Sequence, residues 1–395
     1  MKRQQAAQLF SEAHRLHRIG HSHRAVGAIL GVSRVTIIKW LAQPRYGDQR
    51  GWQPGRPRKH TDSQVVDRIC GIKKDLVDHN YFFGNAYVQM VYHKCYPQDP
   101  RPSLWYIDDV VRRAGLQGRK PKTKQRGGSV YQLYPKESLE HLGLIHQAGD
   151  FIGKKYLEGS SSPVTVFSSC YYRPFKLYHI QRTDGEKAIL AMGILAHQWA
   201  DYPIPDVFRF DNGGPFRGTG HLPRRLGTFV VFLLNLGITP LFSSPSKPWT
   251  NGAMEGHNRV FTDKIWRKHR FQNHHQIDVE IDRFNGESTE FCLYRYPTLI
   301  KRYRNRCLKV TPSTFSTHLR TRRNKKIAFV RFVQPTLDER KDHITIMNEA
   351  VYLPERYSNQ FVFALWDLQH EDLTILSEYD GRTHQVKRIP FKIND

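Results

Sequence analysis

The sequence predicts an α/β core built on a mixed five-stranded sheet, preceded by two all-α units and followed by a small β-barrel. Three observations support this prediction. Strand and helix patterns alternate between residues 140 and 268, which is typical of an α/β layer arrangement. Before this region, apolar residues recur at helical spacing. After residue 320 the pattern changes to short strands without helical periodicity.

The chain is strongly basic. Lysine and arginine number 61 against 36 aspartate and glutamate residues, so the 395-residue chain carries a formal net charge of +25. This excess predicts a polyanionic partner, with nucleic acid as the leading class and an anionic membrane as the alternative. No apolar run reaches the roughly 18 residues of a membrane span, and the first residues lack the apolar core of a signal peptide. We therefore expect a soluble, cytoplasmic protein without a membrane partner, associated with the nucleoid if its source is bacterial.

Residues 1–50 predict a helix-turn-helix domain. Amphipathic helices are expected over 5–18 and 23–30, after which Gly31 permits a tight turn and Ser33 can cap a third helix. We expect the core face of that third helix to consist of Val35, Ile38 and Leu41. The opposite face then carries the residues that we predict to bind DNA in the major groove, Arg34, Thr36 and Lys39. A small structural helical hairpin is the alternative interpretation.

Residues 61–117 form the second predicted helical unit, a helix-turn-helix or winged-helix-like domain. A Pro/Gly-rich basic linker, 51–60, precedes it, and a second basic linker, 118–135, follows it. The predicted DNA contacts lie at the end of the unit and in the second linker: Arg112, Arg113, Arg119, Lys120, Lys122, Lys124 and Arg126. We expect this linker to follow DNA phosphates or a minor groove, with a merely solvated linker as the alternative.

Residues 136–318 are predicted to hold the α/β core and a helical extension. The expected strands end at Asp150, cover 164–172 and 175–181, end at Asp211 and cover 238–242; the expected helices are 185–200, 226–237 and 251–268. The last region, 319–395, contains five short strand patterns. A small β-barrel is the natural closure for such a set.

Three acids of the core are candidate metal ligands: Asp150, Asp211 and Glu255, separated by 61 and 44 positions. Two are expected at strand ends and the third near the start of a helix, so the fold can bring them together. A cluster of carboxylates needs a cation, and hard divalent ions favour oxygen ligands. Two such ions can promote displacement at a phosphodiester. We therefore predict that these acids are catalytic and hold two Mg²⁺ ions, for which Mn²⁺ can substitute.

Each acid taken singly has a structural alternative. Asp150 and Asp211 suit turns. Glu255 can pair with Arg259 four residues later on a helix. The coincidence of all three with the motifs around them favours the metal site. Arg259 and Lys264, on the same predicted helix, are then expected to contact DNA phosphates beside the metals.

The surroundings of these acids resemble the DDE transposase/integrase superfamily, which includes retroviral integrases and bacterial insertion-sequence transposases. The resemblance rests on "GDFIG", "IPDVFRFDNGGPF" and "PSKPWTNGAMEGHNR" and covers roughly residues 140–285. It implies a ribonuclease H-like catalytic core in which Asp150, Asp211 and Glu255 form the metal-binding triad. The helical units and the terminal barrel are similar in type to those of bacterial and phage Mu-like transposases.

The resemblance implies a Mg²⁺-dependent polynucleotidyl transferase that binds the ends of a mobile element, cleaves DNA and joins 3′-hydroxyl ends to target DNA. The expected partners are double-stranded DNA, as terminal repeats and target, further copies of the chain in a synaptic complex and, as an optional partner, a helper ATPase. One alternative is a catalytically inactive or domesticated DNA-binding regulator with the same fold. Another is a plain ribonuclease H-type nuclease, which does not need two N-terminal DNA-binding units.

Overall fold

The computed structural model describes residues 3–43, 63–82, 84–117, 134–218, 220, 222–321, 325–335, 342–379 and 382–394. These residues form two compact units, Met1–Cys70 and Gly71–Asp395, and the boundary falls inside one helix, α4. The linker 51–60 and residues 118–133 lie outside the described ranges. With them lie the predicted DNA contacts Arg119, Lys120, Lys122, Lys124 and Arg126.

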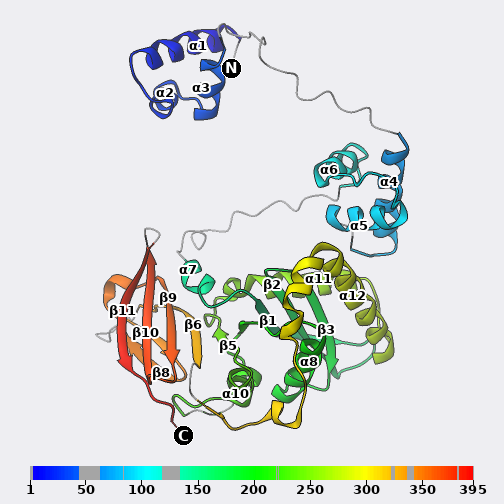
Figure 1. Cartoon of the computed structure of the whole chain (residues 1–395), viewed down its shortest axis with the longest axis vertical. Helices are drawn as coiled ribbons and strands as arrows, with labels where there is room; N and C mark the ends of the chain where they lie inside the picture. Colours follow the sequence, from blue (N-terminus) through cyan, green and yellow to red (C-terminus); the bar gives the residue numbers. More distant parts are fainter. Residues whose placement is uncertain are drawn as a thin grey trace. The chain divides into compact units, whose positions relative to one another are not determined.

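Helices and strands follow one another in the order expected for an α/β protein with helical N-terminal units (Figure 1). The helices are α1 (Arg3–Arg18), α2 (His23–Leu30), α3 (Arg34–Leu41), α4 (Ser63–Asp78), α5 (Asn85–Cys95), α6 (Leu104–Arg113), α7 (Lys136–Glu140), α8 (Ala188–Asp201), α9 (Gly214–Arg217), α10 (Thr228–Asn235), α11 (Gly252–Phe261), α12 (His274–Arg295) and α13 (Pro297–Tyr303). The strands are β1 (His146–Tyr156), β2 (Pro163–Arg173), β3 (Leu177–Thr183), β4 (Val207–Phe210), β5 (Thr239–Phe242), β6 (Lys326–Phe332), β7 (His343–Ile346), β8 (Glu349–Tyr352), β9 (Phe361–Asp367), β10 (Asp372–Tyr379) and β11 (Arg382–Pro390). Within the described residues, no helix has the length and apolar character needed to cross a bilayer.

The first unit contains the expected turn between two capped helices. α2 ends at Gly31, whose φ of 64° is a conformation that suits glycine. α3 begins after Ser33, whose Oγ accepts a hydrogen bond from Thr36 N at 3.1 Å. The buried core of the three helices consists of Phe10, Ala13, Leu16, Val26, Ile37 and Trp40.

The core face that we predicted for α3 is wrong for Val35 and Ile38, whereas Leu41 is partly buried and packs against the core of the unit. Ile37 and Trp40 are buried, whereas Val35 and Ile38 are 61% and 42% exposed. Trp40 offers the largest apolar surface of the helix, and Ile37 lies on the same face three residues earlier, so this pair buries more area. Arg34 and Lys39 remain exposed and Thr36 is half-buried. The outer surface of α3 therefore combines cationic and apolar side chains.

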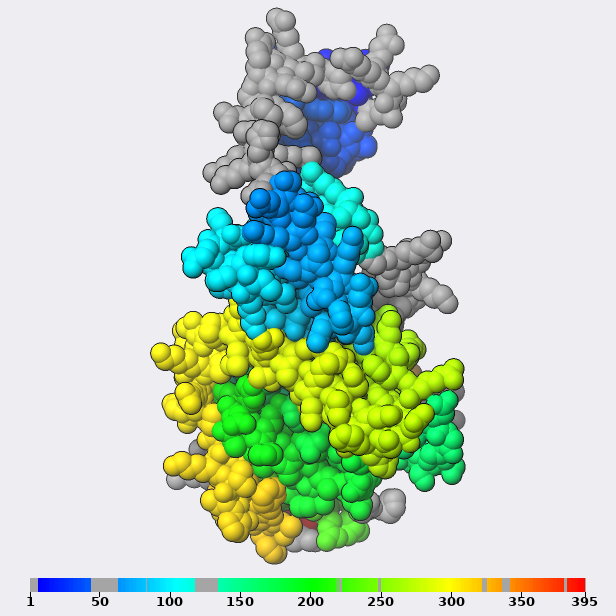
Figure 2. Space-filling model, turned by 90° about the vertical axis from the view of Figure 1, so that its right-hand side faces the viewer, coloured from blue at the N-terminus to red at the C-terminus, as the bar shows by residue number. Residues whose placement is uncertain are grey.

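The second helical unit packs against the core. α6 begins after Ser103, which accepts a hydrogen bond from Tyr106 N at 3.1 Å, and the described residues between 63 and 117 contain helices but no strand. Phe82 stacks on Phe284 of α12, with ring centroids 5.2 Å apart. In Figure 2 the surface of this unit, in blue and cyan, meets the yellow surface of α11 and α12.

The five strands predicted for the core form one continuous part of a larger sheet. Their spatial order is β3-β2-β1-β4-β5, in which β1, β2 and β3 pair antiparallel while β4 and β5 run parallel to β1. Apolar side chains on one face of the sheet pack against α8 and α10. On the other face, Ile152 and Val166 pack against α11, the π-helical turn Thr262–Trp266 and α12.

The sheet has nine strands rather than the predicted five. β6 pairs parallel with β5 through Leu241–Ala328 and Phe242–Phe329, and β9, β10 and β11 extend the sheet from β6. The C-terminal strands are therefore joined to the core sheet, in place of the separate small barrel that we predicted. One predicted strand is split into the β7–β8 hairpin because Met347 and Asn348 both have positive φ, which reverses the chain there.

Candidate active site

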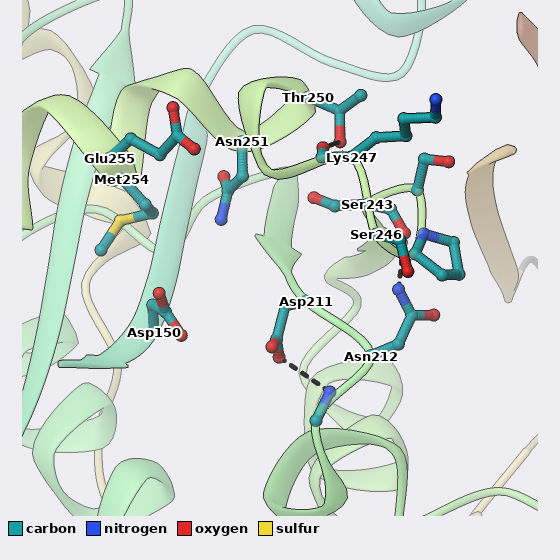
Figure 3. A pocket seen from close by; sticks show the side chains of 13 residues that line it. Asp150, Asp211, Asn212, Ser243, Ser246, Lys247, Thr250, Asn251, Met254 and Glu255 are labelled. Atoms are coloured by element: carbon teal, nitrogen blue, oxygen red, sulfur yellow. Dashed lines mark hydrogen bonds between the residues drawn. The ribbon is translucent and has the colours of Figure 1, made fainter. Parts of the chain in front are cut away.

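An open cleft of about 500 Å³ brings the three predicted carboxylates together (Figure 3). Its lining comprises Asp150, Asp211, Asn212, Gly213, Ser243, Ser244, Pro245, Ser246, Lys247, Thr250, Asn251, Met254 and Glu255. These residues come from β1, the turn after β4, the loop after β5 and the start of α11. Because β1, β4 and β5 are parallel, the segments that follow β4 and β5 meet at one edge of the sheet, where ligands bind in open α/β folds.

Asp150 lies within β1, not at its end as predicted. The strand continues to Tyr156 because pairing with β2 extends beyond Asp150, which lies opposite Ser168. Burial, together with the negative charge of Asp211, raises the pKa of Asp150 to about 7. Asn258 of α11 donates a hydrogen bond to Asp150 Oδ2 at 3.3 Å and accepts one from Ser168 Oγ at 2.7 Å. This network holds Asp150 at the wall of the cleft.

Asp211 follows β4 directly, as predicted, and its carboxylate turns back on its own backbone. Asp211 Oδ1 accepts a hydrogen bond from Gly213 N at 2.9 Å. A Cβ atom at position 213 would lie only 2.9 Å from the same Oδ1, so a side chain there would displace the carboxylate of Asp211. Asn212 Nδ2 donates to Ser243 O at 2.6 Å, which links the turn to the end of β5. In Figure 3, Asp150 and Asp211 face the same space.

Glu255 lies in the first turn of α11 and is exposed to the cleft. Its neighbour Met254 is buried against Ala148 and Cys170, and this contact fixes the start of α11 on β1 and β2. The structural alternative, an ion pair between Glu255 and Arg259, is not formed, because Arg259 Nε lies 3.5 Å from Asp263 Oδ2 instead. Glu255 therefore keeps its carboxylate on the cleft.

The chemistry of the cleft suits a hard divalent ion, although the carboxylates do not converge closely. Among the described residues, no three His, Cys, Asp or Glu side chains lie close enough to hold an ion as they stand. Three buried oxygens of the lining have no hydrogen-bond partner within the described part of the chain: Ser243 Oγ, Ser244 Oγ and Asn251 Oδ1. Buried oxygens of this kind need a donor or a cation, and Mg²⁺ takes carboxylate, carbonyl and water oxygens. The lining is therefore rich in oxygen donors of the type that a hard divalent ion takes, although its side chains as they stand form no metal-binding group.

Two residues of the site were missed by the sequence analysis. Lys247 is the one basic side chain in the described lining of the cleft, and its Nζ lies 4.2 Å from the ring centroid of Phe332. It stands in the quoted block "PSKPWTNG", so its position in the loop before Glu255 was a usable signal. Asn258, which contacts Asp150, stands in "GHNR" and was likewise present in the motif.

The predicted DNA contacts at the end of α6 are paired with an acid. Arg112 Nη2 lies 2.5 Å from Asp109 Oδ1, and Arg113 Nη2 lies 2.6 Å from Asp109 Oδ2. Both side chains remain about half exposed or more, so one carboxylate is shared by two accessible cations. Their role toward DNA stays a prediction.

Lys264 does not lie on an exposed DNA-binding face as predicted. Its Nζ donates to the backbone oxygens of Asn80 and Tyr81 in the second helical unit, at 3.3 Å for Asn80. Burial lowers the pKa of Lys264 to about 8, although the carboxylate of Glu287 opposes this effect. Its neighbour Arg259 has a side chain that is 73% exposed and stays available to a phosphate. The two predicted cations of this helix therefore have different surroundings.

Comparisons with known proteins give similarity to solved structures alone. No family model and no curated protein matches the chain. Among solved structures, a chain of the complex described as "CryoEM structure of simian T-cell lymphotropic virus intasome in complex with PP2A regulatory subunit B56 gamma" is similar. The match has 12% sequence identity and a TM-score of 0.31, and it covers 75% of this chain and 95% of that chain.

Proposed function

We propose that this protein is a Mg²⁺-dependent DNA transposase or integrase with a ribonuclease H-like catalytic core. The observation that carries the proposal is that Asp150, Asp211 and Glu255 line one cleft, although 61 and 44 positions separate them in the sequence. The neighbouring strands β3, β2, β1, β4 and β5 of the larger mixed sheet support the proposal. The net charge of +25 supports a polyanionic substrate.

The three carboxylates and the partnerless oxygens of the lining would hold the metal. A bound divalent ion lowers the pKa of a coordinated oxygen nucleophile and stabilises the leaving oxygen. Asp211, fixed by its bond to Gly213 N, and Asp150, fixed by Asn258, supply preformed positions for this charge. Lys247, at the rim of the cleft, is placed to neutralise a DNA phosphate next to the carboxylates.

The proposal is tested with a supercoiled plasmid that carries the DNA flanking the coding gene, incubated with Mg²⁺ or Mn²⁺. Wild-type protein is expected to nick the flanks and to join the freed 3′ ends to target DNA. Asp211→Asn keeps the size of the side chain and removes its charge, so a metal ligand is weakened. Cleavage should fall about a thousandfold, which corresponds to a loss of about 4 kcal/mol of transition-state stabilisation.

Asp184→Asn is the matched control. It removes one carboxylate charge at a side chain that is 93% exposed and does not line the cleft, so cleavage should be unchanged. Equal cleavage by wild type and Asp211→Asn would refute the proposed function.

The absence of a ready three-ligand group among the described residues favours one second candidate, a DNA-binding regulator without catalysis. In that case the wild-type protein binds the flanking DNA and leaves it intact. Asp150→Ala and Glu255→Ala then bind this DNA as tightly as wild type. Metal-dependent cleavage by wild type distinguishes the transposase from the regulator.

A further inference from the structure

Arg331 of β6 is a buried cation that connects three distant segments. It is 4% exposed. Its Nε donates to Thr345 O of β7 at 2.8 Å, its Nη1 to Ser243 O after β5 at 2.9 Å, and its Nη2 to Asn212 Oδ1 at 3.0 Å. Within the described part of the chain, its hydrogen-bond acceptors are carbonyl and amide oxygens rather than carboxylates. Burying a guanidinium without a carboxylate is costly, so this arrangement calls for a functional reason.

The contacts of Arg331 converge on the residue that follows Asp211. Asn212 Oδ1 accepts from Arg331, while Asn212 Nδ2 donates to Ser243 O, which Arg331 also contacts. The three groups form a closed network that ties the turn after β4 to the end of β5. Since the carboxylate of Asp211 is oriented by Gly213 N in the same turn, the network also sets where that carboxylate lies.

The next residue of β6 contacts the loop that follows β5. The ring of Phe332 lies under Lys247 of the loop after β5. Consecutive residues of one C-terminal strand therefore reach the Asp211 turn and the loop that leads to Glu255. This link exists because β6 pairs with β5 in the core sheet.

We propose that Arg331 is a positioning residue for the Asp211 turn, and that it acts through Asn212. Its significance for catalysis rests on the proposed function, whereas its effect on the turn does not. The C-terminal strands are then part of the scaffold of the active site.

The first test measures amide hydrogen exchange by mass spectrometry in peptides that cover residues 211–217, without DNA. Arg331→Met removes every guanidinium donor and keeps an unbranched apolar side chain. Exchange in 211–217 should rise about tenfold, as expected when a buried hydrogen-bond network opens locally, while exchange in β1 stays unchanged. Asn212→Ala should give the same local rise. The double variant should be no worse than either single variant, because the two residues act through one network.

Lys325→Met is the matched control. Lys325 immediately precedes β6 and is also a buried cation bonded to an amide oxygen, but its partner is Asn235 at the end of α10, which does not line the cleft. This variant should leave exchange in 211–217 unchanged. Arg331→Lys keeps the charge and one donor group, so it should restore part of the protection.

The second test measures plasmid cleavage by the same variants. Arg331→Met should lower kcat about 100-fold through misplacement of Asp211 and leave KM for DNA unchanged. Unchanged exchange in 211–217, or an equal rise throughout β6 and with Lys325→Met, would overturn the positioning role. If the wild-type protein cuts no DNA, the proposed function is refuted. The hydrogen-exchange data still test the role of Arg331 in that case. If Arg331→Met does not fold, Arg331→Lys and Asn212→Ala carry the test.

Discussion

Two clusters of charged side chains within Gly71–Asp395 differ in how their charges are compensated. In the cleft, Asp150, Asp211 and Glu255 share one space, and Lys247 is the one cation in the described lining. Where the second helical unit meets the core, opposite charges alternate. There Glu287 Oε2 accepts from Phe82 N at 2.9 Å, Arg283 pairs with both Glu280 and Glu287, and Lys264 is bonded to Asn80 and Tyr81.

The difference lies in whether the protein neutralises its own charges. At the docking contact, each of these ionised groups has a partner within the chain, although burial still raises the pKa of Glu287 and lowers that of Lys264. In the cleft, burial and Asp211 together raise the pKa of Asp150, which marks a repulsion that a bound cation would relieve. Perturbed carboxylates in a cleft are typical of functional sites.

The largest expected effect comes from Asp150→Asn. On the proposed function, DNA cleavage should fall about a thousandfold, because a metal ligand is lost. The stability of the folded variant, in contrast, should be higher than that of wild type. The folded pKa of about 7 exceeds the ordinary value, so ionised Asp150 destabilises the fold fully above pH 7 and not at all below about pH 4. In a chelating buffer, the variant should therefore melt at a higher temperature than wild type at pH 8, and the difference should vanish toward pH 4. A lower melting temperature at pH 8 contradicts this account of the cleft.

A pair of variants tests whether Lys264 and Arg259, which the sequence analysis assigned the same role, differ in function. Lys264→Met should cost about 1–3 kcal/mol of unfolding free energy, because two backbone oxygens lose their donor. Its affinity for DNA should be unchanged. Arg259→Met should leave stability unchanged and weaken DNA binding, with the log–log salt slope falling by about 0.9. The measurements are chemical denaturation and DNA-binding titrations at several salt concentrations. If Lys264→Met instead weakened DNA binding and left stability unchanged, Lys264 would be a DNA-binding residue as the sequence predicted.

The smallest expected effect tests a third kind of environment, a buried group that stays uncharged. His257 is fully buried on α11 and stacks on Tyr178 at 4.5 Å between ring centroids. Burial lowers its pKa to about 3. The unfolded chain therefore binds a proton between pH 6.5 and 3 that the folded chain excludes, so stability falls as pH falls through this range. His257→Phe keeps the stacking, and its melting temperature should fall by roughly 2 °C less than that of wild type between pH 7 and 5. Parallel pH curves for the two proteins would exclude this role.

Some of this architecture could be predicted because its causes are local. Asp211 was placed correctly at the end of a strand because an apolar run and an Asp-Asn-Gly-Gly turn follow one another in sequence. The cap Ser33 and the turn at Gly31 were predicted for the same reason. Glu255 was placed near the start of its helix because the expected helix began at residue 251.

Errors arose where a distant segment decided the outcome. Asp150 was expected at a strand end, but pairing with β2 carries β1 on to Tyr156. The barrel was expected to be separate, but β6 found a partner in β5. On α3, the helical period allowed two apolar faces, and packing around Trp40 selected the one we did not choose.

The sequence by itself determined the basic character of the chain, the positions of most turns and caps, and the three acids worth examining. These features depend on composition and on neighbours within a few residues. Only the tertiary structure decided which charges remain without a partner in the chain. It paired Lys264 with the second helical unit, left Asp150 facing Asp211, and placed Arg331 behind Asn212. The physical reason is that the energy of a charge depends on its burial and on partners that folding brings from elsewhere in the chain.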